Sequence, residues 1–159
     1  MTSYRFRVKA SWNPKGIYRD IIIGSDRMLE DLQRAINTAF GLDSDHLWFF
    51  GTDQDYWQSR VKYLCPLEFE SPDPLGEWFE FFSGRVSEER HNAAEVPLRD
   101  LNLALRDRLC YLFDYGDEWM FYLILEEKRE DDPSDGAPIL LKRKGDDIVQ
   151  YPLDEDEPS

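Results

Sequence analysis

The sequence predicts a single domain of the α+β class, in which an antiparallel or mixed sheet carries one helix across a face. Three observations support this prediction. Apolar and charged residues alternate from 4 to 12, apolar residues recur at helical spacing from 26 to 40, and two apolar runs flank a Gly-Asp pair at 116–117. These patterns are typical of a strand, an amphipathic helix and a hairpin. A β-grasp-like arrangement is one form that this order of elements allows.

An N-terminal hairpin is expected from strands at 4–12 and 17–23, joined by a turn at 13–16 that contains Pro14 and Gly16. One face of the first strand is apolar and should be buried: Tyr4, Phe6, Val8 and Ala10. The other face carries an ordered basic stripe, Arg5, Arg7 and Lys9. We interpret this stripe as the solvated side of the strand, with an anion-binding surface as the alternative.

The single helix is expected from 26 to 40, with Ser25 or Asp26 as its N-terminal cap and Gly41 as its left-handed C-terminal stop. Its apolar residues form one stripe along the predicted helix, Leu29, Leu32, Ile36 and Phe40. Such a stripe packs against a core, so no ligand is assigned to it.

A compact aromatic strand is expected at 46–51, followed by an irregular excursion at about 52–96. That excursion is rich in Pro and Gly, and it holds the aromatic residues Trp57, Trp78 and Phe79. A single helical turn is expected at 97–103. Towards the end, 131–137 reads as a mobile loop, 139–144 as a short apolar-basic piece and 154–159 as an acidic disordered tail, which places the domain at 1–153.

The central C-terminal hairpin is expected to turn at Gly116 and Asp117, with Gly116 as a structural turn residue that supplies a positive φ. This turn pairs Asp114 with Trp119 across the hairpin. Both faces of the two runs are apolar, so the strands should be covered on both sides. The Asp114 carboxylate then needs a donor, either an indole N–H or a nearby backbone amide.

Composition limits the classes of partner. No apolar run approaches the roughly 18 residues of a membrane span, and the N-terminus has no signal-peptide core, so we expect a soluble cytoplasmic protein without a membrane partner. The net charge of −14 disfavours nucleic acid, because that affinity depends on basic residues that neutralise phosphates. A protein partner is favoured, and the oligomeric state is left open.

Motifs of known chemistry are absent from the sequence, which contains no Gly-rich phosphate loop, nucleophile elbow or helical metal-ligand pair. With His46 and His91 as the two histidines, a multi-histidine zinc site is excluded. Cys110 is expected to be a buried thiol, and a disulfide with Cys65 is left open. We therefore predict no cofactor and assign no catalytic residue.

Three carboxylates crowd the hairpin turn, Asp114, Asp117 and Glu118. Together with His46 they have the oxygen and nitrogen ligands of a divalent-cation site. The favoured interpretation is a solvated turn, because Asp suits turns for local hydrogen-bonding reasons. No metal site is assigned.

The segments FDYGDEW at 113–119 and HLWFF at 46–50 resemble the plasmid pRiA4b ORF-3-like family. LEDLQRAINTAFG at 29–41, LRDLNL at 98–103 and KGDDIVQYP at 144–152 are similar in the same order, so the resemblance spans the chain outside 52–96. It implies a compact α+β domain of uncharacterised function that is sometimes encoded beside mobile-element genes. The family-typical candidate site consists of His46, Trp48, Asp114, Asp117, Glu118 and Trp119, with Gly116 in the turn.

The leading hypothesis for function is therefore a non-enzymatic binding or interaction module with a protein partner, with the aromatic residues of the excursion as its interface. One alternative is an accessory nucleic-acid-binding protein linked to plasmids or mobile elements, which would use the basic stripe. Another is a metal-dependent enzyme at the rim of the hairpin, which requires His46 and the three acids to converge.

Overall fold

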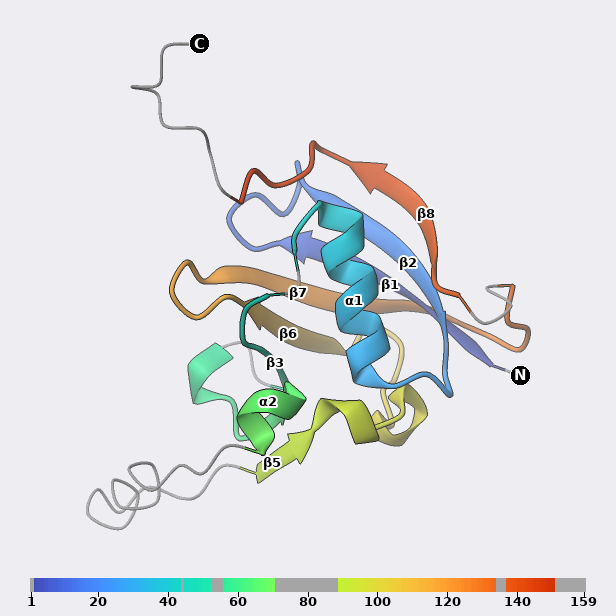
Figure 1. Ribbon diagram of the computed structural model, residues 1–159. Helices are drawn as coiled ribbons and strands as arrows, with labels where there is room; N and C mark the ends of the chain where they lie inside the picture. Colours follow the sequence, from blue (N-terminus) through green and yellow to red (C-terminus); the bar gives the residue numbers. More distant parts are fainter. Residues whose placement is uncertain (1, 44, 53–55, 71–88, 134–136, 151–159) are drawn as a thin grey trace.

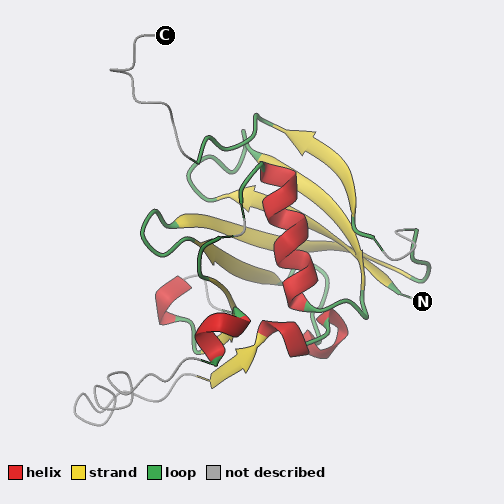
Figure 2. Ribbon diagram, viewed as in Figure 1, coloured by secondary structure: helices red, strands yellow, loops and turns green. Residues whose placement is uncertain are grey.

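The computed structural model describes residues 2–43, 45–52, 56–70, 89–133 and 137–150. Within these residues, eight strands form one mixed sheet in the order β5-β4-β3-β6-β7-β1-β2-β8. Helix α1 lies across one face of this sheet (Figures 1 and 2). The predicted α+β class, with its N-terminal hairpin, single main helix and central C-terminal hairpin, is confirmed. None of the described helices has the length and apolar character that crossing a bilayer demands.

The strands are β1 (Ser3–Ala10), β2 (Tyr18–Gly24), β3 (Trp48–Gly51), β4 (Val61–Leu64), β5 (Glu89–Asn92), β6 (Arg108–Phe113), β7 (Trp119–Arg129) and β8 (Ile139–Lys144). The helices are α1 (Leu29–Phe40) and the short α2 (Pro66–Phe69). Three 3-10 turns complete the list, η1 (Tyr56–Gln58), η2 (Ala93–Glu95) and η3 (Leu98–Leu101). Turn η3 is the helical turn that the sequence predicts at 97–103.

The N-terminal hairpin lies well inside the sheet. β1 pairs antiparallel with β2 on one side and with β7 on the other. The alternation in the sequence is borne out, because Tyr4, Phe6, Val8 and Ala10 are all buried. The residues between them are half-buried on the opposite face of the sheet. The period-two pattern thus gave both the strand and its orientation.

Helix α1 begins at Leu29, three residues later than expected, and its N-cap is Met28 rather than Ser25 or Asp26. The carboxylate of Asp31 accepts a hydrogen bond from the Met28 backbone N–H at 3.0 Å. Residues before Met28 cannot join the helix because they bond to the segment before β6, where Met28 bridges Pro97. The predicted stop is confirmed, since Gly41 has a φ of 78°.

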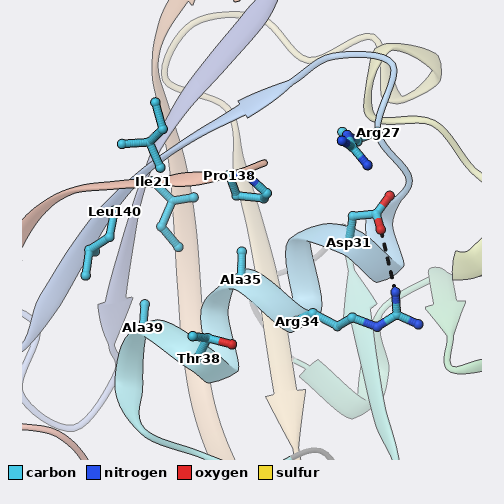
Figure 3. A pocket seen from close by; sticks show the side chains of 10 residues that line it. Ile21, Arg27, Asp31, Arg34, Ala35, Thr38, Ala39, Pro138 and Leu140 are labelled. Carbon is cyan, nitrogen blue, oxygen red and sulfur yellow. Dashed lines mark ion pairs between the residues drawn. The ribbon is translucent and has the colours of Figure 1, made fainter. Parts of the chain in front are cut away.

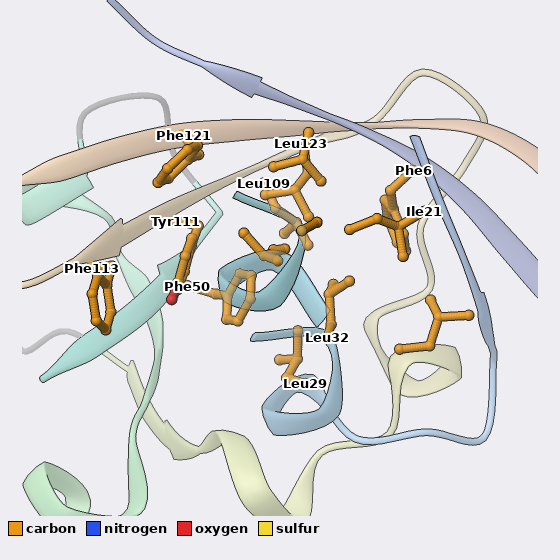
Figure 4. Close-up of a cluster of buried hydrophobic side chains, with 14 of the residues drawn as sticks. Phe6, Ile21, Leu29, Leu32, Phe50, Leu109, Tyr111, Phe113, Phe121 and Leu123 are labelled. Carbon is orange, nitrogen blue, oxygen red and sulfur yellow. The ribbon is translucent and has the colours of Figure 1, made fainter. Parts of the chain in front are cut away.

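The core lies between α1 and the inner face of the sheet (Figure 4). Leu29, Leu32, Ile36 and Phe40 have no solvent exposure, as their spacing predicts. They meet aromatic residues of the central strands, including Phe50, Tyr111 and Phe121. Each such side chain contributes about 1.5–3 kcal/mol through removal of apolar surface from water. A helix this short is only marginally stable in isolation, so this packing supplies most of its stability.

The excursion at 52–96 is more regular than expected. It contains η1, β4, α2 and β5, and β4 and β5 extend one edge of the sheet. Each of these strands has four residues, too few for a period-two pattern to be evident. The expected interface residues Trp78 and Phe79 lie outside the described residues, as does the predicted acidic tail at 154–159. The apolar-basic piece at 139–144 is strand β8, which forms the other edge.

Candidate functional site

Two of the predicted site residues lie in one row across the sheet. Trp48 of β3 is opposite Phe113 of β6, and Phe113 is opposite Trp119 of β7. Cross-strand partners share a face, so all three side chains are on the side of α1. Trp12 packs against Trp119 with 5.5 Å between the ring centroids. In the described part of the chain, Trp119 Nε1 has no hydrogen-bond partner. This row closes one end of the core.

His46 precedes β3 and lies between two carboxylates. Its Nδ1 is 3.7 Å from Asp114 Oδ2, and its Nε2 is 3.9 Å from Asp43 Oδ1. The imidazole also meets the edge of the Phe113 ring, at 5.7 Å between centroids. Both polar separations are longer than a hydrogen bond. The pairing of His46 with Asp114 is therefore an electrostatic contact that strengthens when His46 is protonated.

Asp114 organises the turn of the hairpin. Its Oδ1 accepts hydrogen bonds from the backbone N–H groups of Gly116 at 3.1 Å and Asp117 at 3.3 Å. The Asp114 carbonyl accepts a third bond, from the Glu118 N–H at 2.6 Å. The donors that the sequence required for Asp114 are thus backbone amides, and not the indole of Trp119.

The register of this hairpin differs by one residue from the prediction. Trp119 is opposite Phe113 instead of Asp114, so the loop between the paired residues has five residues. Gly116 does not have a positive φ; the left-handed positions are Asp114 (φ 66°) and Glu118 (φ 53°). Asp tolerates this region because its short carboxylate bonds to nearby backbone. The longer loop therefore forms without glycine at a left-handed position.

The acids of the turn do not converge. Asp114 is buried, while the carboxylates of Asp117 and Glu118 are exposed and form no ion pair with any described residue. Over the described ranges, no group of three or more His, Cys, Asp and Glu side chains is arranged to hold a metal ion. The rim of the hairpin is therefore a turn that local hydrogen bonds fix, and it contains one buried carboxylate, that of Asp114.

Replacing Asp114 with alanine should lower the free energy of unfolding by about 1–2 kcal/mol, because alanine is strained at positive φ and leaves two amides without their acceptor. Asp114→Asn should cost less, since its amide oxygen keeps the acceptor. Urea denaturation measures both. Asp117→Ala serves as the control and should stay within about 0.5 kcal/mol of the parent. An Asp114→Ala variant as stable as this control would contradict the role given to the Asp114 side chain.

A polar pocket of about 460 Å³ opens beside His46. It is bounded by the first half of α1, by Trp48 and by the start of α2. Its charged groups largely satisfy one another, as Arg34 is ion-paired with Glu30 and Asp31. Cys65 lines it as a buried thiol, and neither Cys65 nor Cys110 is in a disulfide, so the disulfide that the sequence left open does not form. The polar groups here show no arrangement suited to one ligand.

The predicted basic stripe is largely neutralised. The Arg7 guanidinium donates two hydrogen bonds to the Asp20 carboxylate, at 2.8 and 3.0 Å. Arg5 lies 3.6 Å from both Asp20 and Glu127. Because these two cations are already paired within the sheet, the stripe offers little charge to a nucleic-acid backbone. The contacts of this stripe thus do not favour the nucleic-acid alternative that would use it.

The feature that sequence reasoning missed is a groove of about 350 Å³ between α1 and β8 (Figure 3). Its walls are mainly apolar, with Ala35 and Ala39 from the helix facing Ile21 and Leu140 from the sheet. Arg27, Asp31 and Arg34 lie at one end, where Arg34 pairs with Asp31. The helix residues lie beside the predicted core stripe, so their spacing alone does not distinguish a groove from the core.

Strand β8 is the last strand of the sheet, and it pairs only with β2 among the described strands. No other described strand therefore pairs with the outer side of its backbone. Leu140 and Leu141 of this strand are exposed by 45% and 54%. An open strand edge beside an apolar groove is an arrangement that accepts an additional strand.

Comparison with known proteins places this fold. A family model described as plasmid pRiA4b ORF-3-like protein matches residues 2–150. Among solved structures, the crystal structure of MM3350, a protein of unknown function from Methanosarcina mazei Go1, matches with a TM-score of 0.68. That match covers 92% of this chain and 72% of that chain at 18% identity, so it shows the fold alone. Comparison with curated proteins gives no match.

Proposed function

We propose that this chain, which belongs to the plasmid pRiA4b ORF-3-like family, is a non-enzymatic binding module that takes up an extended segment of a partner protein along strand β8. The observation that carries this proposal is the open edge of β8 beside the apolar groove under α1. The backbone of β8 would supply hydrogen bonds to the added strand, and the groove would receive its side chains.

The dimensions of the edge suit such a segment. β8 has six residues, which corresponds to roughly 20 Å of extended chain. Side chains of an added strand alternate between the two faces of the sheet, so every second one would point towards the side of α1. There the groove presents Leu140 and Ala35, whose apolar surface is incompletely covered by the chain itself. In this proposal the interface lies on β8 and α1, away from the aromatic excursion.

The exposed aromatic residue that remains from the earlier hypothesis is Trp57, which is 41% exposed. Its ring already packs against Phe49 and Tyr115, at 5.2 and 4.8 Å between centroids. Trp57 therefore covers the outer face of the sheet beside β3. A covering role explains its contacts, and the open edge of β8 is the better candidate for an interface.

The test begins with selection of displayed random peptides of about ten residues, a length that spans β8, against the intact protein. Leu140→Asp is expected to weaken a selected peptide by about tenfold or more, because a carboxylate would enter the apolar groove. Leu105→Asp is the matched control, since Leu105 is 56% exposed and does not line the groove. Bound peptide should also slow hydrogen exchange of the amides in β8.

Binding that survives Leu140→Asp unchanged would place the site elsewhere on the molecule. Failure of the selection to enrich any peptide would overturn the proposal as a whole. The two variants should be equally folded, because both residues are surface-exposed in the parent. Circular dichroism and urea denaturation of both variants check this condition before affinities are compared.

A further inference from the structure

The geometry points to an acidic partner, and we infer that the segment bound at β8 carries an apolar residue followed by acidic residues one and three positions further along the strand. This inference rests on the proposed function and names the chemistry of its partner. It follows from the faces on which the side chains of β8 lie and from the charges they leave unpaired.

The register between β2 and β8 assigns each side chain to a face. Leu140 is opposite Ile21, whose side chain is in the core under α1, so Leu140 lies on the helix side. Lys142 is opposite Asp20, and Lys144 is opposite Tyr18. Asp20 bonds to Arg7 on the outer face, so Lys142 and Lys144 lie on that outer face. Leu141 is the extra residue of a bulge between these pairs.

The two lysines form a cationic patch for which the described residues provide no carboxylate partner. Their Nζ atoms lie 5.6 and 5.7 Å from the centre of the Tyr18 ring. Among the described residues, neither lysine forms an ion pair with a carboxylate. The nearest acid across the strand, Asp20, already binds the Arg7 guanidinium in a two-bond contact. In a chain of net charge −14, two neighbouring cations that pair with no described carboxylate at a strand edge are unexpected.

The neighbouring cation on the helix side is different. Arg143 is opposite Arg19, and it pairs with Asp147 at 3.0 Å. The charge of Arg143 is already neutralised by Asp147. The residue of an added strand that faces Arg143 therefore has no preferred charge. The positions facing Lys142 and Lys144 are the ones where a carboxylate gains an ion pair at the sheet edge.

An added strand without a bulge places its residues in register with this pattern. The residue that faces Leu140 is apolar and enters the groove. The next residue faces Lys142 and is acidic, the following one faces Arg143, and the one after that faces Lys144 and is acidic. In a parallel segment the apolar residue comes before the acidic residues in the sequence of the partner. In an antiparallel segment the acidic residues come first.

The same charges argue against a second copy of this chain as the occupant. Two β8 strands paired edge to edge would bring their own cations together, since Lys142 and Lys144 lie on the same face of a strand of six residues. Like charges opposite each other destabilise a strand pair, and lysines on an edge are a common guard against self-association. An acidic segment has the complementary charge.

Two peptides of about ten residues, a length that spans β8, provide the test, one alternating valine with glutamate and one alternating valine with lysine. Fluorescence anisotropy measures each dissociation constant at physiological salt. The glutamate peptide is expected to bind about tenfold tighter, since two exposed ion pairs replace two like-charge contacts. The double variant Lys142→Glu/Lys144→Glu should reverse this preference. Lys128→Glu/Arg99→Glu changes the net charge equally at exposed sites away from β8 and should leave it intact.

The outcomes separate this inference from the function on which it rests. If both peptides bind equally and both slow the exchange of β8 amides, strand addition holds and the acidic preference is overturned. If neither peptide binds and the random selection also enriches none, both proposals fail. Tighter binding of an oligothymidylate of about ten nucleotides, lost in the Lys142→Glu/Lys144→Glu variant, would assign the lysines to phosphate instead and overturn the acidic-segment inference.

Discussion

Arg19→Met is expected to lower the free energy of unfolding by about 2–4 kcal/mol, a large effect for a single substitution. Arg19 is completely buried in β2. Its guanidinium donates to four backbone carbonyls, those of Tyr18, Ala39, Lys144 and Asp146, and to the carboxylate of Asp147. Methionine keeps an unbranched apolar stem but leaves these acceptors without their donor.

The hydrogen bonds lost in Arg19→Met connect β2 to α1, to β8 and to the segment after β8. Ala39 belongs to the last turn of α1, which has no basic residue of its own, so Arg19 supplies the cation that favours the end of a helix. Lys144 and Asp146 mark the end of β8 and the segment after it. A single side chain of β2 therefore fastens α1 and β8 together, and these are the two walls of the groove.

Urea denaturation of Arg19→Met measures this effect. Arg34→Met is the control, because Arg34 is exposed and its described ion pairs are with acids of its own helix; its change should stay within about 0.5 kcal/mol. Hydrogen exchange adds a local readout, since the amides of β8 should exchange faster in Arg19→Met under native conditions. Equal stability of the two variants would show that the buried guanidinium contributes no more than a surface one.

Arg19 also shows what the sequence revealed and what it concealed. Its position has the same parity as Ile21 and Ile23, so the period-two pattern places it on the core face of β2. Because charged residues are rarely fully buried, an arginine at such a core-facing position normally suggests that the strand has ended. The carbonyls that satisfy it come from β8 and from the end of α1, more than a hundred residues apart in sequence. No local pattern contains that information.

The same distinction explains the hairpin at 113–119. The two apolar runs predicted both strands, and the core confirms that both faces are covered near the turn. The register depended on the loop length, which the Gly-Asp pair suggested to be short. Since Asp114 and Glu118 adopt the left-handed region in place of Gly116, the loop gained one residue and every cross-strand pair moved by one.

The candidate site was the least predictable part. His46 and Asp114, two of the family-typical residues, lie close together, whereas the exposed acids of the turn remain separate from them. The groove depends on β8 pairing with β2 and on α1 crossing both. Its helix residues, Ala35 and Ala39, are small residues beside a strong Leu-Ile-Phe stripe. Their importance is apparent only once the edge of the sheet is known to lie next to them.

Tyr111→Phe is expected to lower the free energy of unfolding by about 2–4 kcal/mol at neutral pH, since it removes one oxygen and leaves two buried groups unpaired. The Tyr111 hydroxyl donates to Asn37 Oδ1 at 2.7 Å and accepts from Gln33 Nε2 at 3.2 Å. Both partners are on α1 and are almost completely buried. The hydroxyl is thus the polar connection between α1 and the centre of the sheet. Tyr111→Phe/Gln33→Leu should recover part of the loss, because an apolar leucine no longer needs the missing acceptor.

Alkaline pH gives this prediction a second, independent readout. Burial raises the pKa of Tyr111 well above its ordinary value of 10.0, because the phenolate would be isolated in the core. The unfolded chain therefore releases this proton first, and the stability that the neutral hydroxyl contributes is present below pH 10 and declines as the pH rises above it. Burial also raises the pKa of Tyr56, to about 12, so part of the decline remains in the variant. The stability of Tyr111→Phe should consequently fall less steeply than that of the parent between pH 9 and 11, and the difference in linkage slope should approach about one proton at the upper end of this range. Parallel slopes in the two proteins would mean that Tyr111 ionises as readily in the folded chain as in the unfolded one, and the buried connection to Gln33 and Asn37 would then be wrong.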